Sequence, residues 1–172
     1  ALFCAVQNGH QAALMAPTEI LAEQHAQSLS RLFSPLGIHV TLLTGSFSGA
    51  QKRACKQAIQ DGTAQLIVGT HALLTQDVAF HDLALVVCDE QHRFGVAQRA
   101  ALSSKAASPH LLVMSATPIP RTLSLIAYGD LDVSVISELP PGRKPVETFL
   151  VGEDKRQRLN GFIEKQCTLG HQ

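Results

Sequence analysis

The segment LALVVCDEQHRFGV, residues 83–96, carries the strongest indication of the fold. It begins as an unbroken apolar run of strand length and ends in two adjacent acids, Asp89 and Glu90. Because the run does not alternate between apolar and polar residues, it predicts a strand that is buried on both faces. Such strands are typical of a parallel sheet that is covered by helices.

Four further apolar runs of strand length surround this stretch, at residues 12–16 (AALMA), 38–43 (IHVTLL), 65–68 (QLIV) and 110–114 (HLLVM). Helical segments separate most of them. Thr18 can cap a helix from Glu19 to about Phe33, and Ser48 and Gln51 form a capping box for a helix that stops at Asp61-Gly62. The alternation predicts an α/β fold, a three-layer sandwich around a mostly parallel sheet.

The character of the chain changes at ELPPGRKPV, residues 138–146, whose prolines are compatible with neither a helix nor a central strand. We therefore expect a first lobe over residues 1–137, a linker over 138–146, and the start of a second lobe over 147–172. In the last part, VETFLV (146–151) resembles a strand and Glu153 to Cys167 a helix.

Composition excludes several classes of protein. The 172 residues carry no net charge, so no overall basic field indicates nucleic acid. No apolar stretch approaches the roughly 18 residues that cross a bilayer. The four cysteines form no Cys-x-x-Cys pair, which fits the reduced thiols of a cytoplasmic protein.

Polar residues at the ends of the last two strands suit phosphate chemistry. Asp89 could hold Mg²⁺ through water and Glu90 could position a water for attack on a phosphate. Ser115 and Thr117, on either side of Ala116, would reach the same sheet edge. Each group also has a plainer interpretation, since acids and hydroxyls at strand ends often serve only as turn caps.

These segments resemble a known family. Asp89-Glu90-Gln91-His92 and Ser115-Ala116-Thr117 look like motifs II and III of superfamily 2 helicases. The strings DEQHRFGV, MSATPIPRTL and ELPPGRKPV resemble the RecG family in particular. The resemblance implies a RecA-like motor lobe that uses ATP and Mg²⁺, with catalytic residues at 89–92 and coupling residues at 115–117.

The same resemblance implies DNA contacts at three loops. ALMAPTEILAEQH (13–25) resembles motif Ia, and LLTGS (42–46) and VGTHALL (68–74) resemble further DNA-facing motifs. The candidates for contact with the DNA backbone are Pro17, Thr18, Thr44, Gly45, Thr70 and His71. Without the family these residues would be taken for ordinary turns and caps, and the basic cluster Lys52, Arg53 and Lys56 for a solvated face.

No Gly-x-x-x-x-Gly-Lys-Ser/Thr loop occurs in the sequence. We therefore expect the chain alone to be inactive, with the phosphate-binding loop, a DNA-binding domain and most of a second RecA-like lobe in other parts of a parent protein. The implied activity is an ATP-dependent, cytoplasmic and nucleoid-associated DNA helicase that remodels forks and Holliday junctions.

Two alternatives remain open. One is the translocase lobe of a transcription-repair coupling factor, although Gln91 and ELPPGRKPV favour the RecG family. The other is a non-catalytic docking module with a helicase fold, which retention of Asp89, Glu90, Ser115 and Thr117 argues against.

Overall fold

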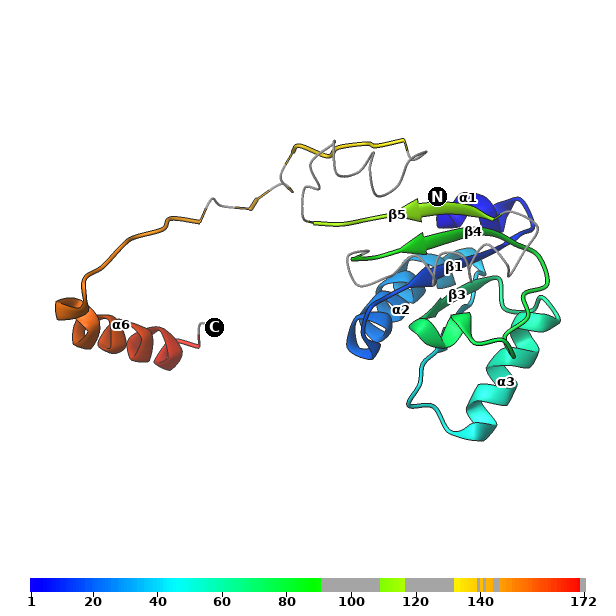
Figure 1. Ribbon diagram of the computed structural model, residues 1–172, viewed down its shortest axis with the longest axis horizontal. Helices are drawn as coiled ribbons and strands as arrows, with labels where there is room; N and C mark the ends of the chain where they lie inside the picture. The colour runs from blue at the N-terminus through cyan, green and yellow to red at the C-terminus, as the bar shows by residue number, and fades with distance from the viewer. Residues whose placement is uncertain (91–108, 117–131, 139, 141, 144–145, 171–172) are drawn as a thin grey trace. The chain divides into compact units, whose positions relative to one another are not determined.

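The computed structural model describes residues 1–90, 109–116, 132–138, 140, 142–143 and 146–170 (Figure 1). The chain divides into two units, Ala1–Ser124 and Leu125–Gln172. This division falls among residues outside the described ranges. The lobe boundary predicted at residues 137/138 therefore stays a prediction.

The first unit is built on a five-stranded sheet in the order β2-β3-β1-β4-β5. Figure 1 shows β5, β4, β1 and β3 in that sequence from top to bottom. Every pairing between neighbouring strands is parallel. The predicted parallel sheet is confirmed, with its strands at β1 (Gln11–Met15), β2 (Val40–Leu43), β3 (Leu66–Gly69), β4 (Leu83–Cys88) and β5 (His110–Val113).

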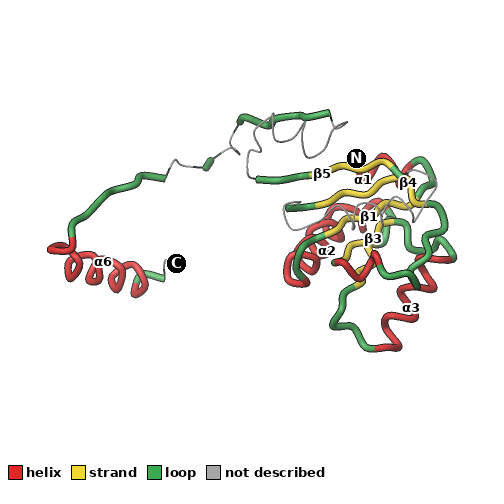
Figure 2. The backbone as a smooth tube through the Cα atoms, in the orientation of Figure 1, coloured by secondary structure: helices red, strands yellow, loops and turns green. Residues whose placement is uncertain are grey.

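Helices cover both faces of the sheet, as the tube in Figure 2 shows. On one face, α1 (Leu2–Gln7) and α2 (Glu19–Phe33) pack on alternate residues of β1, Ala12 and Leu14. On the other, Ile59 of α3 (Gly49–Gln60) packs with Ala13 and Met15. All of β1 is buried, which explains its unbroken apolar sequence.

The helix starts follow the capping signals in the sequence. The Thr18 hydroxyl accepts a hydrogen bond from the Leu21 amide at 3.3 Å. Ser48 and Gln51 make both bonds of the predicted capping box, at 3.3 and 2.9 Å. A cap of this kind stabilises a helix by about 1 kcal/mol, so both segments are helical for local reasons.

One strand begins later than its apolar run predicts. The run starts at Ile38, but Gly37 adopts φ 75° and the Ile38 amide donates to the Phe33 carbonyl at 3.1 Å. These residues complete the end of α2 and the short 3-10 turn η1 (Ser34–Leu36). β2 therefore begins only at Val40.

The second unit contains η4 (Glu153–Lys155) and α6 (Arg156–Thr168). Together they cover the helix predicted from Glu153 to Cys167. The strand predicted at residues 146–151 is wrong, because these residues have no regular secondary structure. A strand needs a partner for its backbone groups, and no described residue pairs with this segment. Within the described residues, no helix combines the length and apolar character that a membrane span requires.

Candidate functional site

Because the five strands are parallel, their carboxyl ends lie at one edge of the sheet, here called the carboxyl edge. Loops at this edge are where ligands bind in open α/β sheets. Each predicted site residue that the structure describes lies shortly after the end of a strand there: Pro17 and Thr18 after β1, Thr44 and Gly45 after β2, Thr70 and His71 after β3, Asp89 and Glu90 after β4, and Ser115 and Ala116 after β5. Gln91, His92 and Thr117 lie outside the described residues.

The order of the strands divides this edge into two halves. The candidates for DNA contact follow β2, β3 and β1, whereas the acids and hydroxyls follow β4 and β5. The helix α2 starts at the boundary between the halves, because it follows β1 directly. Side chains of α2 can therefore touch both groups of loops.

The acids and Ser115 are held on neighbouring strands. Cys88 is paired with Val113, and the Met114 amide donates to the Cys88 carbonyl at 2.8 Å. On its other side, the Asp89 amide donates to the Met15 carbonyl at 2.9 Å. The end of β4 is thus fixed from both sides, and Asp89 and Ser115 leave adjacent strands in the same direction.

The carboxylate of Asp89 has a partner that the sequence did not indicate. His25 Nε2 of α2 lies 2.7 Å from Asp89 Oδ2. Both side chains are half-buried, with exposed fractions of 30% for His25 and 22% for Asp89. His25 lies at helical spacing between Leu21 and Leu29 of α2. A titratable residue within such an apolar stripe is the one sequence signal that could have indicated it.

Glu90 has an unusual backbone. Its φ is 51°, in the left-handed region, and it is the only non-glycine residue with positive φ in the described part of the chain. This conformation costs roughly 1–2 kcal/mol for a residue with a side chain. Strain of this kind occurs preferentially at functional sites, which fits the catalytic role predicted for Glu90.

The loop after β2 is held by two opposite charges. Glu19 Oε1 of α2 accepts a hydrogen bond from the Ser46 amide at 2.9 Å. Lys52 Nζ of α3 donates to the Gly45 carbonyl at 2.5 Å. That amide and carbonyl belong to one peptide unit, so the Gly45–Ser46 peptide is clamped at both ends of its dipole.

The clamp also lowers the pKa of Glu19. The main cause is hydrogen bonding by the Ser46 side chain; the Ser46 and Gly45 amides and the Lys52 charge add to it. A Cβ at Gly45 would lie 3.0 Å from Glu19 Oε1, so a side chain there would make the carboxylate shift slightly. Glu19 therefore satisfies the Ser46 amide within the fold.

The two predicted threonines are buried, Thr44 at 0% and Thr70 at 1% exposure. The Thr44 hydroxyl hydrogen-bonds the Ser46 hydroxyl at 3.0 Å, and the Thr70 hydroxyl accepts from the Ala72 amide at 3.4 Å, where it caps η2 (His71–Leu74). Their hydroxyls shape the loops from inside. Gly45 and His71 are the exposed candidates.

The basic cluster on α3 is largely used within the fold. Lys52 binds the Gly45 carbonyl, and Lys56 pairs with Asp77, whose pKa it lowers. These contacts support the structural interpretation of the cluster over direct contact with DNA.

The residues also limit how a divalent cation could bind. In the described part of the chain, no three or more His, Cys, Asp or Glu side chains form a metal-binding group. Mg²⁺ commonly keeps several waters and takes one or two carboxylates together with substrate phosphates. A single half-buried carboxylate such as Asp89 fits that mode, and a fully protein-bound metal does not.

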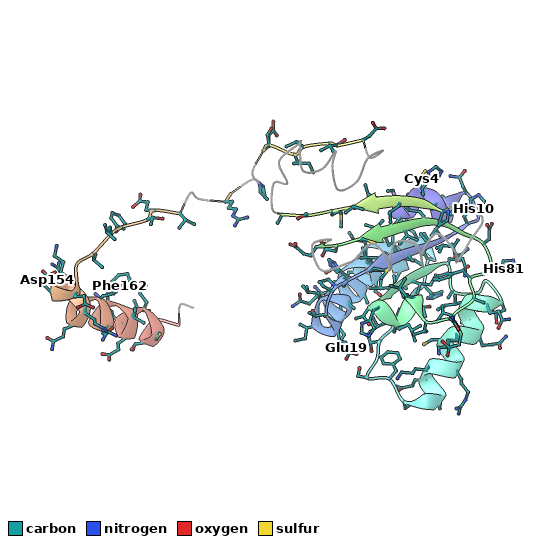
Figure 3. All side chains as sticks on the ribbon, in the orientation of Figure 1. Cys4, His10, Glu19, His81, Asp154 and Phe162 are labelled. Carbon is teal, nitrogen blue, oxygen red and sulfur yellow. The ribbon has the colours of Figure 1, made fainter. Side chains whose placement is uncertain are left out.

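At the opposite edge of the sheet, where the strands begin, a buried side chain has a structural role. The buried Gln11 amide donates to the Ile59 and Ala64 carbonyls at 2.9 and 2.7 Å and accepts from the His81 and Asp82 amides at 2.8 and 3.0 Å. In Figure 3, Glu19 lies on one side of the first unit and His10 and His81 on the other. Gln11 ties the loops of that far edge together.

Comparison with known proteins places this geometry in a family. The model of the DEAD/DEAH box helicase matches residues 1–126. The chain belongs to the DEAD/DEAH box helicase family. Its three-layer parallel sheet is accordingly the RecA-like fold of a helicase lobe.

Within this helicase family, the chain is similar to RecG proteins over nearly all of its length. It is 51% identical over 171 residues to the ATP-dependent DNA helicase RecG of Haemophilus influenzae, and 49% identical over 172 residues to that of Bacillus subtilis. These matches cover 97% and 100% of the chain but 25% of each relative. The chain thus spans about a quarter of the length of these curated relatives.

A solved RecG structure bound to a three-way DNA junction has the same fold. It superposes with a TM-score of 0.79 and 44% identity, covering 94% of this chain and 22% of that one. The predicted resemblance to the RecG family is confirmed, and it favours RecG over the coupling-factor alternative.

Proposed function

We propose that the chain supplies the first motor lobe of an ATP-dependent helicase that remodels branched DNA, such as forks and Holliday junctions. The observation that carries this proposal is the carboxyl edge, where Asp89, Glu90 and Ser115 stand beside the loops after β1, β2 and β3. The relatives are named ATP-dependent DNA helicases, and one RecG structure holds a three-way junction. The site would be cytoplasmic, at the nucleoid.

In this proposal Asp89 and Glu90 have different roles. Asp89, held by the β4 ladder, would hold Mg²⁺ through water, and Glu90 would position the attacking water, with Gln91 and His92 completing the motif. Bound Mg²⁺ would neutralise charge on the phosphates of ATP. Ser115, Ala116 and Thr117 would couple this half of the edge to a second RecA-like lobe.

The other half of the edge would hold the DNA backbone. Pro17 and Thr18 begin α2, and the exposed Gly45 and His71 present their loops to solvent. Thr44 and Thr70 would act by keeping those loops in shape, since their hydroxyls bond inside them. Phosphate contacts of this kind bind DNA without reading its sequence.

The test is hydrolysis by a full-length protein that carries this chain. We expect ATP hydrolysis that a three-way junction stimulates more than linear duplex does. Glu90→Gln should lower kcat by about 10²–10⁴-fold while ATP binding and junction binding persist. Glu23→Gln, which changes an exposed acid of α2, is the matched control and should leave kcat unchanged.

Two results would contradict the proposal. Turnover by Glu90→Gln within about twofold of the unmodified protein, measured against effects of 10²-fold or more, would remove the catalytic role of this edge. A full-length protein that binds DNA but never hydrolyses ATP would support a non-catalytic docking module instead.

A further inference from the structure

We infer that His25 is a positioning residue for the Asp89 carboxylate, and that it sets the affinity of this site for the divalent cation. The inference rests on the proposed role of Asp89 in holding Mg²⁺. The contact joins residues 64 positions apart, between α2 and the end of β4.

The geometry supports an orienting role. A carboxylate is acceptor-only, so His25 donates its Nε2 hydrogen across the 2.7 Å that separates Nε2 from Asp89 Oδ2. The Asp89 backbone is already fixed by its amide bond to Met15. With one oxygen held by His25, the plane of the carboxylate is fixed too, and its second oxygen has a defined direction.

Burial makes the contact more effective. Asp89 and His25 are 22% and 30% exposed, so water competes only in part for their hydrogen bond. Residues that hydrogen-bond metal ligands typically change metal affinity by about 10–100-fold when replaced. His25 would act through Asp89, without touching the nucleotide.

The placement of His25 on α2 adds a link to the DNA half of the edge. The same helix carries Glu19, which holds the Ser46 amide of the loop after β2. The helix is continuous from Glu19 to Phe33, so the two contacts are about 9 Å apart along its axis at 1.5 Å per residue. One rigid element thus touches a predicted DNA loop and the predicted magnesium carboxylate.

The experiment compares three histidine variants in a full-length protein carrying the chain. His25→Leu removes the donor at a position flanked by Leu21 and Leu29, His25→Gln restores a donor at a similar reach, and His39→Leu changes an exposed histidine as control. Mn²⁺ affinity is measured by electron paramagnetic resonance with a non-hydrolysable ATP analogue. The Mg²⁺ concentration for half-maximal hydrolysis is measured in parallel.

We expect His25→Leu to weaken Mn²⁺ binding and raise the half-maximal Mg²⁺ concentration by about 10–100-fold, with kcat at saturating Mg²⁺ largely kept. His25→Gln should recover most of the loss, and His39→Leu should match the unmodified protein. Unchanged cation affinity in His25→Leu would overturn the inference, as would equal losses in His25→Leu and His25→Gln. Failure of the unmodified protein to hydrolyse ATP would instead overturn the proposed function.

A spectroscopic measurement tests the contact without nucleotide. In the ring ¹⁵N spectrum of the chain, Asp89→Asn should shift the His25 Nε2 resonance and leave that of His39 in place. An unmoved His25 resonance would contradict the contact itself.

Discussion

Cys88 of β4 and Val113 of β5 are parallel partners, and the chain leaves both strands in the same direction toward Asp89 and Ser115. The register of these two strands is sufficient to place Asp89, Glu90 and Ser115 at one edge of the sheet. The clamped Gly45–Ser46 peptide and the His25–Asp89 pair then connect the rest of that edge to α2. These relationships lead to the following predictions.

Removing the Glu19 carboxylate should free the Ser46 amide. Glu19 Oε1 accepts the hydrogen bond of this amide, and an amide that loses its acceptor opens to water more often, so Glu19→Ala should measurably speed exchange of the Ser46 amide hydrogen. Two-dimensional NMR of the chain measures this. Glu23→Ala is the control, and equal protection of Ser46 in all three proteins would show that Glu19 does not hold the loop.

Acid should weaken the fold partly through the same residue. The pKa of Glu19 is below its ordinary value of 4.5 because Ser46 hydrogen-bonds to it, so the carboxylate stabilises the fold above 4.5 and stops doing so as the pH falls through the lowered pKa. Hydrogen bonds from Thr63 lower the pKa of Asp61, and the hydrogen bond from Lys56 lowers the pKa of Asp77. Both carboxylates therefore also stop stabilising the fold as the pH falls below their ordinary pKa of 3.8. Urea unfolding at a series of pH values should show a smaller acid loss in Glu19→Gln; superimposable profiles would contradict the assignment.

Gly69 should not tolerate a side chain. A Cβ there would lie 2.4 Å from the Leu43 carbonyl oxygen and 2.8 Å from Leu73 Cγ. Gly69→Ala should therefore lower the free energy of unfolding by about 1–3 kcal/mol. At Gly49 the nearest atom, Arg53 Nη1, is 3.6 Å away, so Gly49→Ala should cost nothing, and equal effects of the two changes would refute the close approach.

The buried side-chain amide of Gln11 should contribute more to the free energy of unfolding than any glutamine on the surface. Gln11→Leu leaves two carbonyls and two amides without this partner, and an unsatisfied buried group costs about 1–3 kcal/mol. We expect a loss of about 3 kcal/mol in chemical denaturation on that basis. Gln24→Leu, on the exposed face of α2, should change stability by less than about 0.5 kcal/mol; a similar small change for Gln11→Leu would contradict the bonding pattern.

The parts of the fold that local chemistry determines could be predicted from the sequence. The apolar run before Asp89 predicts β4, and the capping signals at Thr18 and Ser48 predict the starts of α2 and α3. Each depends on neighbours within a few residues. The common edge of Asp89 and Ser115 could also be predicted, because consecutive parallel strands end on the same side.

Contacts across long sequence separations could not be predicted. His25 and Asp89 are 64 positions apart and Glu19 and Ser46 are 27 apart, so no local pattern distinguishes His25 from a residue that merely packs. The strand order is equally non-local. The failure at residues 146–151 has the same origin, since a β-prone segment becomes a strand only beside a partner.

The most direct test of the central claim is a crystal structure of a full-length protein carrying this chain, with Mn²⁺ and a non-hydrolysable ATP analogue. Anomalous scattering locates the metal independently of the model-building. We predict a manganese peak one water away from the Asp89 carboxylate, with the γ-phosphate at the carboxyl edge beside Glu90 and Ser115. A metal and triphosphate bound away from the ends of β4 and β5 would contradict the account.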